Sequence, residues 1–196
     1  MGRNSIKDVR QQEIILAFYN VAKKLGLENT SLAKVADHMN INPSLIVHYF
    51  KSREHLISGL IQFTLDQYIN IYKPTSDDYA TAADLNRLID NLFSRKWDKL
   101  FDDGVFYSCY ALTYRDKKMR SAFKELHDSL REQLLDAIQK ASRNGVIKVK
   151  NEKEMTEVIF ALLEGAYYYL GMVDSKTEYN RKLNILKHQA RVLLGI

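Results

Sequence analysis

Apolar residues recur along almost the whole chain at the spacing of an amphipathic helix, and polar caps or breaks separate the repeats. The first repeat predicts a helix from about Ile6 to Leu25, with Ile14 and Phe18 on one face and a stop at Gly26. Similar segments follow one another to the end of the sequence. We therefore expect an all-α protein of about nine helices.

Capping residues divide the next part of the chain into three helices. Ser31 can cap one short helix, and Asn42 can cap another that opens with Pro43, whose missing N–H costs nothing in a first turn. A longer helix then spans about 52–72. The polar segment 73–80, which contains a proline and paired aspartates, is predicted to be a linker.

A second group of helices follows this linker. Thr81 and Asp84 resemble a capping box that opens a fifth helix. Its apolar stripe comprises Leu85, Leu88, Ile89, Leu92, Trp97, Leu100 and Phe101. The aromatic stretch 106–114 is predicted to be helical, and a long amphipathic helix then ends at Asn144 and Gly145. Two more helices, capped by Asn151 and Ser175, complete the chain.

Composition agrees with a globular helical protein. Apolar residues make up 46% and charged residues 27% of the 196 residues, and only two prolines and eight glycines are present. The single cysteine, Cys109, has no intramolecular partner for a disulfide or a zinc site. Because no long apolar run occurs and the first residues are polar, we expect a cytoplasmic protein with no membrane partner.

Positive charge is denser at the N-terminal end. Residues 1–60 contain 8 Lys and Arg against 5 Asp and Glu, a surplus of three, whereas the longer remainder has a surplus of two. This distribution suits a surface that faces phosphates. A merely solvated basic face explains it equally well.

Residues 31–50 have the pattern of a helix-turn-helix. Val35 and the small Ala36 let the two short helices approach closely, Ile41 fills the corner between them, and Ile46 anchors the second helix from inside. This phase leaves six residues able to face a major groove. They are Asn42, Pro43, Ser44, Leu45, Val47 and His48.

The motif HYFKSREHL, which follows at residues 48–56, resembles the signature of the TetR family of regulators. The HYF ending is most similar to the branch that contains the choline-responsive BetI repressors. Specific motifs cover residues 14–60, and the remaining chain is similar in helix count, length and order. The resemblance implies a dimeric repressor without enzymatic activity. It has a DNA-binding domain at residues 1–53, a connecting helix at 52–73, and an effector-binding and dimerisation domain at 74–196.

Several positions depart from the family pattern. Asn40 stands where the turn commonly has glycine, and it also tolerates left-handed geometry. Arg53 replaces a common lysine. Ser44 and Val47 replace a common small glycine and a common phosphate-binding tyrosine, so the operator preference of relatives does not transfer to this chain.

Side-chain chemistry suggests a role for each residue of this segment. Ser31, Tyr49, Lys51 and Arg53 are candidates for phosphate binding through hydroxyl or cationic groups. His48, Asn42 and Ser44 can form hydrogen bonds with base edges, and Leu45 or Val47 can contact a thymine methyl group. Core packing is the alternative for Tyr49 and His48.

The resemblance implies that the last two helices form the dimer. Residues 155–172 are apolar nearly all round, and small residues such as Ala161 and Gly165 permit close helix approach. The final helix contributes Leu183, Leu186, Ala190 and Leu193 to the predicted two-fold interface. A central core helix is the alternative explanation for this pattern.

Aromatic residues are frequent in the C-terminal part, where they predict an effector pocket. They are Trp97, Phe101, Phe106, Tyr107, Tyr110, Tyr114, Phe160, Tyr167 and Tyr168. Glu164, in the middle of an apolar helix, either faces solvent, pairs with a base such as Arg115, or binds a cationic ligand. The ligand interpretation favours a lipophilic or quaternary ammonium cation. Ordinary core packing is the alternative for most of the aromatic residues.

An enzyme and a helical protein-interaction module are less consistent with the sequence than a DNA-binding regulator. The five histidines are scattered singly, and Cys109 lies in an apolar run, so no catalytic, metal-binding or cofactor-binding motif is formed. A helical protein-interaction module without DNA binding would explain the helices but not the motif at residues 48–56.

Overall fold

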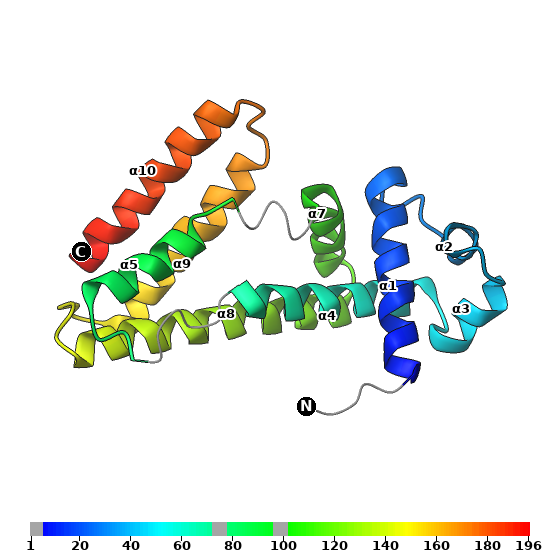
Figure 1. Ribbon diagram of the computed structural model, residues 1–196, viewed down its shortest axis with the longest axis horizontal. Coiled ribbons are helices and arrows are strands. Elements are labelled where there is room, and N and C mark those ends of the chain that lie inside the picture. Colours follow the sequence, from blue (N-terminus) through cyan, green and yellow to red (C-terminus); the bar gives the residue numbers. More distant parts are fainter. Residues whose placement is uncertain (1–5, 72–77, 96–101) are drawn as a thin grey trace. The chain divides into compact units, whose positions relative to one another are not determined.

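The computed structural model describes residues 6–71, 78–95 and 102–196, and for residues 65–71 it describes the backbone alone. The described residues form nine α-helices, one 3-10 helix and no strand, which confirms the all-α prediction. Figure 1 shows these helices along the chain. In the same residues no helix combines the length and apolar character needed to cross a membrane.

The helices group into two compact units. The first contains α1 (Ile6–Leu25), α2 (Leu32–Met39), α3 (Pro43–Tyr49), α4 (Arg53–Ile71) as far as Tyr68, α7 (Asp103–Ala111), the 3-10 helix η1 (Leu112–Tyr114) and α8 (Lys117–Arg143) as far as Leu126. The second contains the rest of α8 with α5 (Ala82–Leu92), α9 (Glu152–Leu170) and α10 (Lys176–Leu194).

The apolar core of the first unit combines helices from the N-terminal part of the chain with α7 and the start of α8. In α1, Ile14 and Phe18 are fully buried, and they belong to one apolar cluster with Leu56 of α4. Val105 and Cys109 of α7, and Met119 and Phe123 of α8, belong to the same cluster. In Figure 1, α2 and α3 lie on one side of α1 and α7 on the other. Apolar surface on both sides of α1 is therefore covered by segments far apart in the sequence.

Polar and apolar contacts hold the helices of the second unit together. Arg191 of α10 donates from Nε to Asn86 Oδ1 of α5 (2.7 Å) and from Nη2 to Asp90 (2.9 Å). Between α8 and α9, Ser142 Oγ donates to Glu152 Oε1 (2.9 Å). Helices α9 and α10 lie side by side, joined by the short segment 171–175.

Most of the predicted helix ends are confirmed, and one needs correction. Thr81 and Asp84 form the predicted capping box. The stripe from Leu85 to Phe101 was expected to be one helix, but α5 ends at Leu92. The hydroxyl of Tyr167 accepts from Ser94 N (2.9 Å) and lies 2.6 Å from Leu92 O, so it satisfies backbone groups that the helix end leaves unpaired. Residues 96–101 lie outside the described residues.

Candidate DNA-binding site

The turn between α2 and α3 depends on a left-handed residue. Asn40 has φ 54° and ψ 45°, which is the geometry expected from its place in the motif. Its N–H bonds to the carbonyl oxygens of Ala36 and Asp37, and Ile41 N bonds to Ala36 O (3.0 Å). At the other end of α2, Ser31 Oγ accepts from Lys34 N (3.3 Å). These local bonds fix the course of the chain into α3.

The side of α3 that is buried is the side predicted from the sequence, on which Ile46 lies. Ile46 is fully buried and belongs to the apolar cluster that also contains residues of α1 and α2, and Phe50 is 2% exposed. The side chains left outside are Asn42, Pro43, Ser44, Val47 and His48, while Leu45 and Tyr49 are half-buried. One face of α3 is therefore free to enter a groove, as a recognition helix requires.

Asn42 has a structural role that limits what it can read. Its Oδ1 accepts from Ser44 N (2.9 Å), which caps α3. The amide oxygen is thus already engaged in one hydrogen bond, and the NH₂ group remains available as a donor. Asn42 is therefore suited to an acceptor on a base edge or to a phosphate.

Tyr49 and His48 have different environments. Tyr49 packs partly against the apolar cluster, so some of its side chain serves the core, as the alternative prediction held. His48 is exposed, and its ring lies edge-on to the ring of Tyr49 with 5.0 Å between their centres. The histidine is the more accessible of the two polar groups.

Arg53 has an intramolecular role that sequence reasoning missed. Its Nε donates to Thr30 O (3.0 Å), and its Nη2 donates to Leu27 O. These bonds pin the start of α4 to the segment between α1 and α2, where Thr30 and Leu27 are buried. No sequence signal reports such a bond, because the partners are backbone atoms 23 and 26 residues away.

Lys51 and Ser52 lie between α3 and α4. Lys51 is exposed, whereas its backbone N–H donates to His55 Nδ1 at 3.4 Å. Ser52 Oγ accepts from His55 N (3.2 Å), which confirms the predicted cap of α4. The lysine side chain is therefore the cation of this segment that is accessible to a phosphate.

The residues predicted for the dimer interface divide into two groups. Ala161 and Gly165 of α9 and Leu193 of α10 are exposed, and Leu186 is half-buried. Leu183 and Ala190 are buried within their own unit and do not lie on the exposed face. Sequence reasoning missed three exposed apolar residues beside them: Val158 of α9 and Ile185 and Val192 of α10.

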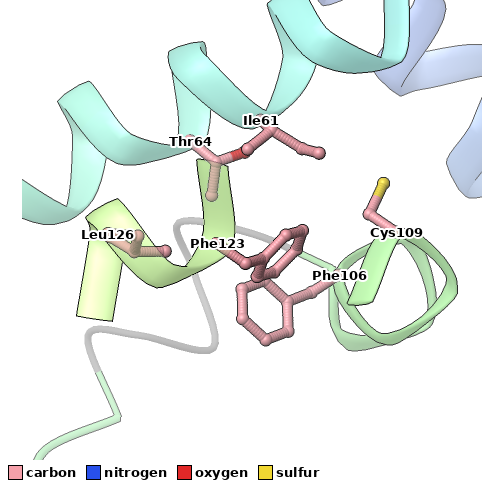
Figure 2. A pocket seen from close by; sticks show the side chains of 6 residues that line it. All are labelled: Ile61, Thr64, Phe106, Cys109, Phe123 and Leu126. Atoms are coloured by element: carbon pink, nitrogen blue, oxygen red, sulfur yellow. The ribbon is translucent and has the colours of Figure 1, made fainter. Parts of the chain in front are cut away.

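A small apolar cavity lies within the first unit (Figure 2). It is lined by Ile61, Thr64, Phe106, Cys109, Phe123 and Leu126, and its empty volume, which includes the opening to solvent, is about 230 Å³. The rings of Phe106 and Phe123 lie next to each other in an edge-to-face arrangement, with 5.6 Å between their centres. Of the residues predicted to bind an effector, Phe106 is the one that lines this cavity.

The other residues of the first unit that were predicted to bind an effector are half-buried or exposed to solvent. Tyr107 is half-buried, Tyr110 is 37% exposed and Tyr114 is 71% exposed. Tyr110 contacts Phe123 edge-on with 5.5 Å between ring centres. Trp97 and Phe101 lie outside the described residues.

Four predicted effector residues belong to α9 in the second unit. Phe160 is buried, with the guanidinium of Arg131 4.2 Å above its ring. Glu164 lies 3.3 Å from His127 Nε2, and nearly half of its side chain is exposed. Tyr168 is exposed, and the hydroxyl of Tyr167 bonds to the end of α5. The base that meets Glu164 is thus His127 of α8.

The thiol of Cys109 is buried and weakly nucleophilic. The residue is 2% exposed, and burial raises the pKa of its thiol to about 12. A thiol with so high a pKa is a poor nucleophile at neutral pH. Across the ranges that the structure describes, no three His, Cys, Asp or Glu side chains are grouped to hold a metal ion.

Two family profiles match the chain. The profile described as bacterial regulatory proteins, tetR family, matches residues 14–60, and that described as tetracyclin repressor-like, C-terminal domain, matches residues 80–196. The second spans more than half of the 196 residues. The chain belongs to the TetR family. The first of these profiles describes a family of bacterial regulatory proteins.

Curated relatives of this TetR-family chain are regulators with a helix-turn-helix. BetI of Burkholderia thailandensis is 26% identical over 87 residues, which are 44% of this chain and 43% of that protein. The match therefore spans less than half the length of BetI. An uncharacterized regulator of Bacillus subtilis, YfiR, is 24% identical over 140 residues, 71% of this chain and 68% of that one.

Solved structures of transcription regulators share the fold over nearly the whole chain. A regulator from Haloarcula marismortui has a TM-score of 0.83 at 16% identity and covers 95% of this chain and 97% of its own. A regulator from Saccharomonospora viridis, solved in complex with choline, has a TM-score of 0.77 at 14% identity, with coverage of 92% and 94%. The TetR-like architecture predicted from residues 14–60 is confirmed for both parts of the chain.

Proposed function

We propose that this chain is a transcription repressor that binds a near-palindromic operator as a dimer in the cytoplasm and leaves the DNA when a small molecule binds. The observation that carries the proposal is the geometry of α3. Its inward residue, Ile46, is fully buried, while Asn42, Val47 and His48 stand exposed on the opposite face. Family membership supports the same function. A protein-interaction module would not require this exposed polar face.

Exposure and bonding distinguish the base-reading residues within α3. Val47 is 43% exposed, so it is better placed than the half-buried Leu45 to contact a thymine methyl group. His48 can donate to or accept from a base edge. Asn42 can donate from its NH₂ group while its oxygen accepts from Ser44 N. Lys51 and Ser31 stand at the ends of neighbouring helices, where phosphate contacts set the register of the helix in the groove.

Replacing His48 by Ala is expected to change which base pairs are preferred. An operator is first selected with the unaltered protein from random duplexes, and its single-base variants are then titrated. Loss of a base contact costs about 1–3 kcal/mol, which relaxes the preference at one or two positions of each half-site by about 5- to 150-fold. Lys148→Ala, at an exposed residue of the second unit outside α9 and α10, is the control. An unchanged base preference in His48→Ala would remove this histidine from the reading surface.

The dimer in this proposal forms through the exposed face of α9 and α10. Val158, Ala161 and Gly165 recur on α9 at spacings of three and four residues, and Ile185 and Val192 on α10 are seven apart, so each set lies on one side of its helix. A side-chain atom added at Gly165 would meet open space, so this part of α9 is uncovered in the single chain. Pairing of two such faces about a two-fold axis would form a four-helix interface.

The effector in this proposal is a small organic cation. Two side chains of the chain itself already occupy this part of the second unit: the imidazole of His127 beside Glu164 and the cationic guanidinium of Arg131 above Phe160. A ligand cation would replace such contacts with the same carboxylate and aromatic face. The neighbour from Saccharomonospora viridis was solved with choline. The cavity of the first unit has no charged lining residue and would favour neutral apolar compounds instead.

One hydrogen bond in the first unit links the start of α7, which contributes to the cavity, to α1. Tyr19 of α1 accepts at its hydroxyl from Asp102 N (2.8 Å), and Asp102 caps α7. Burial raises the pKa of Tyr19. Because the cavity is smaller than most ligand pockets, an occupant must displace Phe106 or Phe123. A shift of Phe106 would move the first turn of α7 and so act on α1.

Calorimetric titration with choline and with its neutral isostere 3,3-dimethyl-1-butanol tests the cation. We expect choline to bind more tightly than the isostere, and Glu164→Gln to weaken choline about tenfold, because one charge contact worth about 1.4 kcal/mol is lost. Glu154→Gln, at an exposed carboxylate of the same helix, is the control. Tighter binding of the neutral compound would refute the cationic effector and leave DNA binding unaffected.

A further inference from the structure

A second basic surface lies outside the helix-turn-helix, on the turn that follows η1 and on the first turns of α8. Residues 115–124 contain five Lys and Arg and one Asp, a net charge of +4, whereas the whole chain has a net charge of +5. All five cationic residues are exposed: Arg115, Lys117, Lys118, Arg120 and Lys124. We call this group the α8 basic surface. A charge count over residues 61–196 as a whole does not reveal this surface, because acidic residues elsewhere in that range balance its positive charge.

Contacts within the chain do not account for three of these five cations. The side chains of Arg115, Lys117 and Lys118 make no ion pair or hydrogen bond with any residue that the structure describes. Arg120 does have an internal partner, because its Nε donates to Thr113 O (2.9 Å). Lysines in the first turn of a helix also oppose the helix dipole. Local stability therefore favours other residues at Lys117 and Lys118.

The α8 basic surface lies close to the start of α4. Met119, next to Lys118, is 3% exposed and belongs to the same apolar cluster as Leu56 and Ile57 of α4. Hydrogen bonds from its own backbone N–H and from Ser52 lower the pKa of Glu54, and the charge of Asp116 opposes this effect. Asp116 is thus within electrostatic reach of the first turn of α4. The accessible cation Lys51 lies immediately before that turn.

We propose that Arg115, Lys117 and Lys118 bind phosphates of the DNA backbone beside each operator half-site, an inference that rests on the proposed DNA binding. Flexible cationic side chains without internal partners suit a phosphate backbone, which they contact irrespective of sequence. The surface belongs to the same compact unit as α3. The partner of the α8 basic surface in this proposal is the DNA duplex that flanks the bases read by α3.

Salt dependence of operator binding tests this surface. Fluorescence anisotropy compares the unaltered protein with the double variant Lys117→Gln and Lys118→Gln across a range of salt concentrations. Each phosphate contact contributes about 0.9 to the slope of log K against log salt, so the slope should fall by about two per protomer. Affinity at low salt should fall by about tenfold or more, with unchanged base preference. The loss should be larger on an operator with flanking duplex than on a minimal one.

Two further double variants make the test specific. Lys148→Gln with Lys150→Gln removes the same charge from exposed lysines of the second unit and should leave the slope nearly unchanged. Lys117→Arg with Lys118→Arg keeps the charge and should retain the slope of the unaltered protein. All four lysines are exposed, so the substitutions should not disturb folding, which a thermal melt checks.

Each outcome has a distinct meaning. If the unaltered protein binds the selected operator and the Lys117 and Lys118 variant has the same slope, the α8 basic surface does not contact DNA. An equal loss in the Lys148 and Lys150 variant would assign the effect to net charge and overturn the proposal. Binding of the unaltered protein to phosphatidylglycerol vesicles, lost in the variant while operator binding is retained, would assign the surface to membranes instead. Failure of the unaltered protein to bind any selected DNA would refute the proposed function itself.

Discussion

Ile185→Glu is expected to convert the dimer into monomers. Ile185 is 49% exposed in the single chain and lies on the face of α10 that we propose to pair with a second copy. A two-fold axis would bring two new carboxylates into one apolar interface, and an unpaired buried charge costs about 3–5 kcal/mol. Because a monomer reaches a single half-site, operator affinity should fall about 100-fold or more.

Light scattering at micromolar concentration measures this change. Asn180→Glu introduces the same charge at an exposed position of α10 more than one turn away and should leave the dimer intact. Leu186→Glu is less selective, because Leu186 is half-buried and its loss also disturbs the single chain. A dimer that persists in Ile185→Glu would place the interface on another face.

Arg53→Met is expected to destabilise the protein even without DNA. The change removes the donors to Thr30 O and Leu27 O, and Leu27 O keeps only its bond from Thr30 N at 3.2 Å. Hydrogen bonds from charged groups contribute about 1.5–3 kcal/mol each, so the free energy of unfolding should fall by about 2–4 kcal/mol. For a chain of this size the melting temperature should fall by about 10 °C.

Thermal melts separate this structural role from phosphate binding. Arg53→Lys keeps the charge but lacks the planar fork, so we expect it to lose much of the same stability. Lys51→Met, at an exposed neighbour, should melt like the unaltered protein while binding operator more weakly. If Arg53→Met has an unchanged melting temperature, the contacts to Leu27 and Thr30 contribute little.

The helix-turn-helix could be predicted in detail because its determinants are local. Ser31 and Asn42 cap helices through backbone groups two or three residues away. Asn40 adopts the left-handed geometry that its own side chain permits. The burial of Ile46 follows from helical phase. Each of these features depends on neighbours within one or two turns, so the sequence pattern contains the required information.

The helices, their caps, the buried side of α3 and the family could be predicted from the amino-acid pattern, because they depend on short-range periodicity and on one contiguous motif. Long-range packing specified three other features. It joined α7 to the core of α1, ended α5 where Tyr167 binds its backbone, and directed Arg53 to carbonyl groups of a distant segment. Such contacts link residues far apart in the chain, and periodicity does not specify which apolar faces meet. The same limit explains why Leu183 and Ile185, two residues apart on one amphipathic helix, face the core and the solvent respectively.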